Sequence, residues 1–308
     1  MTDYILETEE LTKYFPRQVG VEHFNLHVPK GKIYGLLGRN GVGKTTAMKM
    51  LLRLIRPSSG KIILFGKECI RPTDKNYQRI GSLIEAPGFY GNLTAWENLE
   101  ILARLRGQHR KDSIERVLFL MGLEQTASKT FQKFSLGMKQ RLGIAAALMH
   151  EPEFLILDEP MNGLDPIGIC EIRNYLIQLK KEGTTILLSG HVLNEIEQLA
   201  DWIGMMHKGK LLEEVDLNEL RKKNRSYVEF EVSDMHKAVL LLERKFQIFD
   251  YIVIDASRLR IFEKMDRRGE INCSFVEDKI VVTKIRVYEE TLEDYFKKQV
   301  KKEEESIV

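Results

Sequence analysis

The sequence predicts an α/β protein, with a mainly parallel sheet and a helical insert, followed by a second and smaller α+β domain. A buried apolar strand, a glycine-rich loop and a helix follow one another over residues 33–55. Strands return at 154–157 and 185–188 with a helix between them, after a mostly helical stretch from 85 to 150. This alternation is typical of parallel sheets covered by helices. A shift in composition after Gly209 then indicates a separate domain.

The first domain is expected to span residues 1–216, with the helical subdomain at about 86–150. Its strands are marked by alternating or continuous apolar residues, and its helices by apolar residues three and four positions apart. A turn through Pro16 and Gly20 is expected after the first strand. The predicted strands are 4–11, 24–28, 33–37, 61–65, 79–84, 154–157 and 185–188, and the predicted helices are 47–55, 95–105, 113–121, 136–149 and 167–181.

The second domain is expected to cover residues 217–308 and to begin with a polar linker helix at 217–225. The next six elements spell β-α-β-β-α-β, the order of ferredoxin-like folds. They are strand 227–232, helix 236–246, strand 251–254, strand 259–262, helix 267–279 and strand 281–287. A last helix is expected at 292–299, and the charge run 301–305 is expected to be a frayed, solvated end.

The composition narrows the classes of function. Lys and Arg number 47 and Asp and Glu 45, a net charge of +2, so nothing in the charge calls for nucleic acid as a partner. Cys69, Cys170 and Cys273 follow no metal-ligand spacing and are expected to be buried or free thiols in a reducing compartment. The first ten residues show no signal peptide, and no apolar run approaches the roughly 20 residues of a membrane span. We therefore expect another chain to supply any membrane span.

The pattern G-x-x-x-x-G-K-[ST] is met in full between residues 38 and 46 and predicts a nucleoside triphosphate site. Glycines let backbone N–H groups turn inward around the phosphates, Lys44 adds a positive charge, and the Thr45 hydroxyl can ligate Mg²⁺. A strand before the loop and a helix after it would place the phosphates at a helix N-terminus, which disfavours an ordinary glycine-rich turn. The residues of this phosphate loop are Gly38, Arg39, Asn40, Gly41, Val42, Gly43, Lys44, Thr45 and Thr46.

Two carboxylates, Asp158 and Glu159, follow the apolar strand 154–157. In open α/β sheets, ligands bind outside the carboxyl ends of the strands, where these side chains are expected. We expect Asp158 to hold Mg²⁺, directly or through water, and Glu159 to lie beside the attacking water as the general base. Alone, an acidic pair can be a helix N-cap, but beside a phosphate loop the functional interpretation is favoured.

The segment 134–141, Phe-Ser-Leu-Gly-Met-Lys-Gln-Arg, resembles the signature of the ABC ATPase family, Leu-Ser-Gly-Gly-Gln followed by a helix. Ser135 and Gly137 would cap that helix and present an anion site, although the same residues also suit an ordinary N-cap. The resemblance implies a P-loop NTPase of ABC type, with an antiparallel β part beside the parallel core. In that family the signature closes on the γ-phosphate held by the other subunit, so that a homodimer sandwiches two ATP molecules. Leu136 and Met138 depart from the consensus.

Further segments resemble the same family in order and spacing. Asp165, which ends Asn-Gly-Leu-Asp, is similar to the D-loop aspartate that links the two composite sites. His191 resembles the switch histidine, which contacts the γ-phosphate and orients the water, and with Glu159 and Lys44 it completes the implied catalytic set. Phe15 resembles the aromatic residue that stacks on adenine; Tyr14 is the competing candidate, and either can instead belong to the core.

Glu85 stands where most ABC ATPases have a glutamine that reaches Mg²⁺ and relays the nucleotide state to the membrane partner. An ionised carboxylate only accepts hydrogen bonds, so contact with Mg²⁺ stays open while repulsion from the γ-phosphate rises. Glu85 therefore joins Thr45 and Asp158 as a candidate Mg²⁺ ligand, with a solvated loop acid as the alternative. The run 87–95, Pro-Gly-Phe-Tyr-Gly-Asn-Leu-Thr-Ala, resembles the bacitracin-resistance and lantibiotic-immunity exporters, as does the altered signature.

That branch implies the ATPase of an antibiotic exporter, a homodimer on the cytoplasmic face of the membrane that uses ATP and Mg²⁺ to drive a separate permease. Phe89, Tyr90 and Trp96 are candidates for the groove that takes a permease helix, or for the core of the helical subdomain. A soluble ABC protein of ribosomes or DNA is disfavoured, because such members carry two ATPase domains or long coiled coils. An importer ATPase stays open, as does a sensor or dimer-interface role for the second domain.

Overall fold

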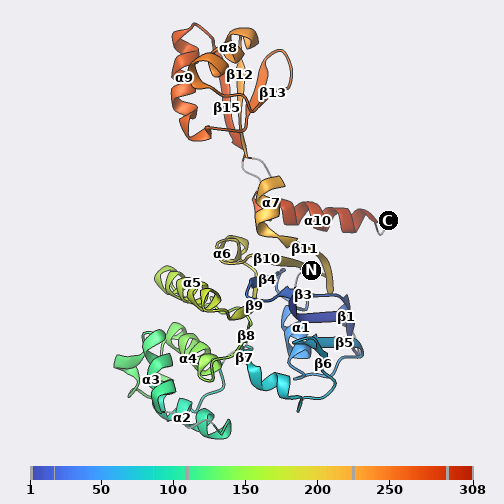
Figure 1. Ribbon diagram of the computed structural model, residues 1–308, viewed down its shortest axis with the longest axis vertical. Coiled ribbons are helices and arrows are strands. Elements are labelled where there is room, and N and C mark those ends of the chain that lie inside the picture. The colour runs from blue at the N-terminus through green and yellow to red at the C-terminus, as the bar shows by residue number, and fades with distance from the viewer. Residues whose placement is uncertain are drawn as a thin grey trace. The chain divides into compact units, whose positions relative to one another are not determined.

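The computed structural model describes residues 3–16, 18–85, 87–107, 111–223, 226–288 and 291–306. The chain forms two compact units, one of Met1–Leu217 with Phe296–Val308 and the other of Asn218–Tyr295. Figure 1 labels the helices and strands of both. The predicted start of the helical subdomain at 86 and the predicted end of the linker helix at 225 lie outside the described residues.

The central sheet of the first unit has six strands among the described residues, in the order β11-β10-β4-β9-β8-β7. All neighbours run parallel except β10 and β11, and β4, β8 and β9 are buried along their whole length. The continuous apolar runs of the sequence therefore form a sheet covered on both faces, which confirms the predicted parallel core. The strands are β4 (Ile33–Leu37), β7 (Ile80–Leu83), β8 (Phe154–Leu157), β9 (Thr185–Gly190), β10 (Trp202–His207) and β11 (Lys210–Asp216).

Two of these strands, β10 and β11, are absent from the sequence prediction. Gly209, after which the composition changes, is the turn that joins them as an antiparallel pair, and its φ of +84° suits glycine. The turn also reaches the phosphate loop, because the Gly209 N–H donates to the carbonyl oxygen of Val42 at 3.0 Å. The change in composition at Gly209 therefore marks a turn inside the first unit, which runs to Leu217.

A second, antiparallel sheet belongs to the same unit, as the fold class predicts. Side chains of this sheet, of the central sheet and of α1 (Lys44–Leu51) share one buried core that includes Phe24, Leu26, Met48 and Phe154. The first strand runs on to Phe15, and β2 occupies most of the segment that was expected to be the turn through Pro16 and Gly20. The predicted strand 24–28 is divided between the end of β2 and the start of β3. The strands are β1 (Tyr4–Phe15), β2 (Gln18–Phe24), β3 (His27–Pro29), β5 (Ser59–Leu64) and β6 (Lys67–Glu68).

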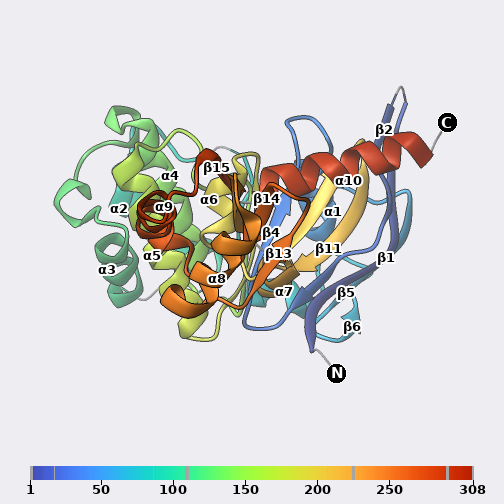
Figure 2. The same cartoon turned by 90° about the horizontal axis from the view of Figure 1, so that it is seen from above.

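The helical subdomain lies at the end of the central sheet opposite the antiparallel strands (Figures 1 and 2). Thr94 and Glu97 form a reciprocal capping box at the start of α2. Phe89 is partly buried and packs edge-on against the buried Phe131 at 5.1 Å between ring centroids, whereas the Tyr90 side chain is exposed. The remaining α-helices of the first unit before its last strands are α2 (Ala95–Leu105), α3 (Lys111–Leu120), α4 (Leu136–Leu148), α5 (Pro166–Lys181) and α6 (Leu193–Glu197). Its 3₁₀ turns are Lys75–Arg79, Glu124–Thr126 and Phe131–Lys133.

The second unit is the predicted β-α-β-β-α-β fold. Its antiparallel sheet has the order β13-β14-β12-β15, and both helices contribute to a core around Phe230 and Phe275, whose rings meet edge-on at 5.5 Å. The elements are α7 (Leu217–Lys223), β12 (Tyr227–Val232), α8 (Met235–Phe246), β13 (Tyr251–Val253), β14 (Arg258–Ile261), a 3₁₀ turn (Met265–Arg267), α9 (Arg268–Glu277) and β15 (Val282–Tyr288).

The last helix, α10 (Leu292–Ser306), corrects the expectation of a frayed end at 301–305. Glu304 accepts a hydrogen bond from Lys208 Nζ at 3.0 Å and lies 3.6 Å from His207 Nε2, so the helix runs past the β10–β11 turn (Figure 2). One charged residue of the tail, Glu304, thus pairs with the β10–β11 hairpin of the same unit. None of the helices in the described ranges is long and apolar enough to cross a membrane.

Gly81 of β7 lies so close to α4 that a Cβ atom there would overlap the carbonyl oxygen of Ala147 and approach Pro152 Cγ to 2.9 Å. We predict that Gly81→Ala lowers the free energy of unfolding of the first unit by about 1–3 kcal/mol, because backbone or helix must shift. Thermal and urea unfolding would measure it. Gly88→Ala is the matched control, since nothing lies within 4 Å of its added Cβ; equal stability of both variants would contradict the prediction.

Candidate functional site

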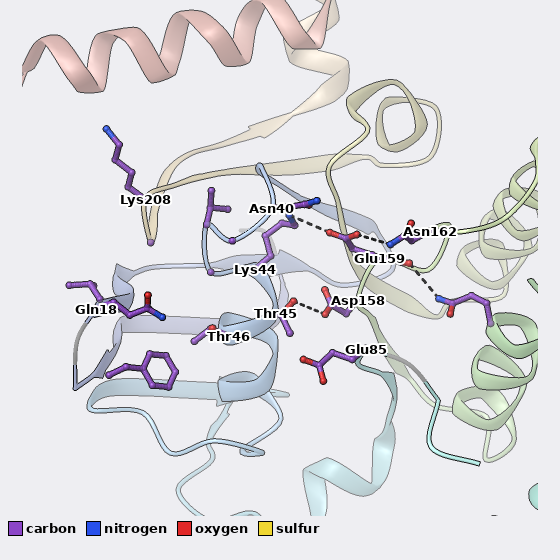
Figure 3. Close-up of a pocket in the computed structure, with 18 of the residues that line it drawn as sticks. Gln18, Asn40, Lys44, Thr45, Thr46, Glu85, Asp158, Glu159, Asn162 and Lys208 are labelled. Carbon is purple, nitrogen blue, oxygen red and sulfur yellow. Dashed lines mark hydrogen bonds and ion pairs between the residues drawn. The ribbon is translucent and has the colours of Figure 1, made fainter. Parts of the chain in front are cut away.

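A cavity of about 850 Å³ lies at the carboxyl ends of the central strands. Figure 3 shows side chains of the phosphate loop, of α1 and of the segments after β7 and β8 facing one another across it. The predicted residues that line it are Phe15, Asn40, Gly41, Val42, Gly43, Lys44, Thr45, Thr46, Glu85, Asp158 and Glu159. Further lining residues, to which the sequence analysis gave no role, are Gln18, Val19, Gly20, Gln140, Lys208 and Gly209.

The phosphate loop is shaped by glycine conformations and by Lys44. Gly41 and Gly43 have φ of +80° and +110°, values that L side chains rarely adopt. Lys44 is only 4% exposed, and its Nζ donates to the carbonyl oxygens of Gly38 at 2.7 Å and Arg39 at 3.1 Å. Gly38 and Arg39 therefore brace the lysine rather than line the cavity. A glycine-rich loop with one buried ammonium at the N-terminus of α1 fits a phosphate chain.

Asp158 is held by two hydroxyl groups. The Thr45 Oγ1 donates to Asp158 Oδ2 at 2.8 Å, and the Ser189 Oγ donates to Asp158 Oδ1 at 2.6 Å. The Ser189 Oγ also accepts from the Glu159 backbone N–H at 2.8 Å. One buried hydroxyl thus joins the ends of β8 and β9. The sequence analysis gave Ser189 no role, and its place two residues before His191 was the available signal.

The other two residues of the predicted catalytic set, Lys44 and His191, lie close to the Glu159 carboxylate. Lys44 Nζ lies 3.5 Å from Glu159 Oε1, and His191 Nδ1 lies 3.1 Å from Oε2. Asn162 Nδ2 donates to the same Oε2 at 3.4 Å. His191 and Glu159 together line a smaller cavity of about 140 Å³ beside the main one. The structure therefore brings the three residues of the predicted catalytic set together at one carboxylate (Figure 3 shows Glu159 with Lys44 and Asn162).

Of the two aromatic candidates, Phe15 lines the cavity and Tyr14 is not among its lining residues. Phe15 lines the cavity with 37% of its surface exposed, and Lys13 Nζ lies 5.4 Å from its ring centroid. Tyr14 is 50% exposed and its hydroxyl donates to Glu22 at 3.3 Å, outside the cavity. Neither ring is a core residue, and of the two Phe15 is the one that borders the cavity.

Glu85 lines the cavity beside Thr45 and Asp158 (Figure 3). Its Oε1 accepts a hydrogen bond from Lys49 Nζ of α1 at 2.6 Å. The sequence analysis placed Glu85 at the site but assigned nothing to Lys49. Glu85, the carboxylate that stands in the place of a glutamine, thus has Lys49 as its ion-pair partner.

The signature residues form a separate cavity. Ser135 caps α4 by accepting from the Met138 N–H at 3.2 Å, and Asp165 caps α5 by accepting from the Gly168 N–H at 3.0 Å. Both line a space of about 560 Å³ together with Gly137. Within one chain, then, Ser135, Gly137 and Asp165 stand apart from the phosphate loop, while Leu136 borders both cavities.

Comparison with known proteins agrees with this arrangement. A family profile described as ABC transporter matches residues 21–162. The bacitracin transport ATP-binding protein BcrA of Enterococcus faecalis is 54% identical over 299 residues, covering 97% of this chain and 97% of that protein. This chain belongs to the ABC transporter family of ATP-binding proteins. The ABC ATPase fold and ATP as the bound nucleotide follow from that membership.

Two further relatives place this ABC ATPase within the family. The lantibiotic transport ATP-binding protein SrtF of Streptococcus pyogenes is 43% identical over 208 residues, covering 68% of this chain and 89% of that protein. A solved structure of the ATP-binding subunit of an ABC transporter has a TM-score of 0.64 and 31% identity, covering 71% of this chain and 92% of that chain.

We predict that Ser189→Ala lowers the rate of ATP hydrolysis about 10- to 100-fold, because Asp158 and the Glu159 backbone both lose the hydroxyl that orients them. Phosphate release at saturating ATP and Mg²⁺ would measure it. Thr185→Ala is the matched control on the same strand: Thr185 is also buried, but its hydroxyl accepts from the Gly31 N–H, away from the cavity. The control should lose about 1 kcal/mol of stability and keep its activity; full activity of Ser189→Ala would contradict the prediction.

Proposed function

We propose that this chain is the ATP-hydrolysing subunit of an exporter that removes a peptide antibiotic, bacitracin or a lantibiotic, from the cell and so confers resistance. The class of cargo is inferred from the 54% identity to a bacitracin transport ATP-binding protein, which extends over nearly the whole of both chains. The 43% identity to a lantibiotic transport protein supports the wider class of peptide antibiotics. The chemistry below rests on the geometry of the cavity.

The phosphate loop is proposed to bind the β- and γ-phosphates, with Lys44 as the buried cation against them. Thr45 and Asp158 offer the hard oxygen donors that Mg²⁺ prefers. Within the described ranges, no three His, Cys, Asp or Glu side chains gather as a metal site. Mg²⁺ uses one or two protein carboxylates and takes its other ligands from phosphates and water. When bound, Mg²⁺ neutralises charge on the phosphates.

Glu159 is proposed to act as the general base on the attacking water. Its carboxylate is 23% exposed, borders both cavities and lies within 3.1 Å of His191. His191 is proposed to orient the water and contact the γ-phosphate. The Ser189 bridge to the Glu159 backbone fixes where the carboxylate emerges from the sheet.

A second copy of the chain is proposed to complete the site. Ser135, Gly137 and Asp165 line a cavity apart from the phosphate loop of the same chain, so a partner subunit would have to bring them to the nucleotide. We propose that this homodimer acts on a separate membrane permease from the cytoplasmic face of the membrane, where the exposed Tyr90 of the helical subdomain is a candidate contact.

We predict that Glu159→Gln binds ATP and accumulates as a closed dimer, with steady-state hydrolysis reduced about 100-fold or more, because the amide cannot accept the proton of the attacking water. Size-exclusion chromatography with ATP and phosphate release would measure both effects. Lys44→Ala is the contrasting variant, which should fail to bind ATP and stay monomeric. Retained steady hydrolysis by Glu159→Gln would refute the assignment of the base.

The cargo is tested by growth inhibition with bacitracin and a panel of lantibiotics. Cells would carry this chain with its candidate permease, or the same pair with Glu159→Gln. We expect protection by the active chain alone, and the drug that is tolerated identifies the cargo. A lack of protection from every drug, with membrane assembly verified, would remove the antibiotic assignment and leave the ATPase assignment intact.

A further inference from the structure

The ion pair between Lys49 and Glu85 connects α1 to the segment after β7 at the rim of the nucleotide cavity. Lys49 Nζ donates to Glu85 Oε1 at 2.6 Å, and the side chains are 29% and 62% exposed. Lys49 follows Thr45 by four residues, so the two side chains share one face of the helix. The lysine therefore approaches the cavity from the same side as the hydroxyl that donates to Asp158.

Glu85 adds a third carboxylate to a cavity that already contains Asp158 and Glu159. Asp158 is oriented by two hydroxyl groups, and Glu159 lies 3.5 Å from Lys44. Glu85 in turn has Lys49. Without that lysine, the Glu85 carboxylate would be free to turn toward the other oxygen donors, Thr45 and Asp158, beside which it lies (Figure 3).

We infer that Lys49 is a positioning residue that holds the Glu85 carboxylate on the α1 side of the rim and competes with Mg²⁺ for it. An oxygen that accepts from an ammonium group is a poorer ligand for a cation, so the pair weakens any contact of Glu85 with the metal. The ion pair consequently restricts the orientation of the Glu85 carboxylate. Lys49 therefore partly sets the Mg²⁺ concentration at which nucleotide binding is half-maximal. The inference rests on the nucleotide site proposed above, whatever the exporter carries.

The test is a double-mutant cycle of Lys49→Gln and Glu85→Gln on the full chain. The readout is equilibrium binding of a non-hydrolysable ATP analogue over a series of Mg²⁺ concentrations, with hydrolysis measured separately. Binding by the unaltered chain establishes the nucleotide site first, so a failure of that site is distinguishable from a failure of the inference. Salt is kept at 0.5 M or more, so that effects of charge beyond about 5 Å are screened.

We expect Lys49→Gln to lower the Mg²⁺ concentration for half-maximal binding about 2- to 5-fold, the range that an exposed ion pair allows. In the Glu85→Gln background the same substitution should leave it unchanged. Lys49→Arg should restore the parent value, since it keeps the charge and the hydrogen bond. An equal shift in both backgrounds, or no shift in either, would overturn the inference.

Lys61→Gln is the matched control for the loss of a surface lysine. Lys61 Nζ donates to Glu9 at 2.9 Å in a comparable exposed pair, and neither residue lines the cavity. This variant should keep the Mg²⁺ dependence of the parent chain. If Lys61→Gln shifts that dependence as much as Lys49→Gln does, the effect is one of net charge and the inference fails.

Discussion

The parallel register of β4, β9 and β8 is the constraint on which the whole site depends. Leu37 pairs with Gly190, and Leu188 pairs with Leu157, so the three strands end at one edge of the sheet. The phosphate loop precedes the acidic pair by more than 100 residues, and His191 follows that pair by about 30. Only this register makes the three neighbours. A slip of one residue would turn each strand's final side chain to the opposite face.

The motifs and most of the helices and strands could be predicted because each one depends on a short, continuous stretch of sequence. Continuous apolar runs marked the buried strands, and the glycine-lysine-threonine pattern marked the loop. Contacts between stretches could not be predicted in the same way. The Ser189 hydroxyl serves Asp158 and Glu159 at once, and that role depends on the alignment of two strands rather than on any local pattern.

The largest omission was the pair of strands near the end of the first unit, and its cause is physical. β10 and β11 were not predicted because Gly209 and the charged residues after it suggest a boundary, whereas they form a hairpin at the edge of the sheet. The tail at 301–305 also has the composition of a solvated end. Glu304 nevertheless finds Lys208, which lines the nucleotide cavity. Charge runs cannot be classed as free ends without knowing which opposite charges lie nearby.

Glu85, which stands where most ABC ATPases have a glutamine, likewise cannot be judged without its charged partner. In this case the partner reduces the expected effect of the charge. Taken alone, a carboxylate in the place of a glutamine adds repulsion to a site that binds phosphates. Its effect depends on Lys49, whose position four residues after Thr45 is plain in the sequence but whose partner is fixed by the end of β7. A family motif that changes charge is therefore best judged together with the side chain that faces it, because the functional unit here is the pair and not the substituted residue.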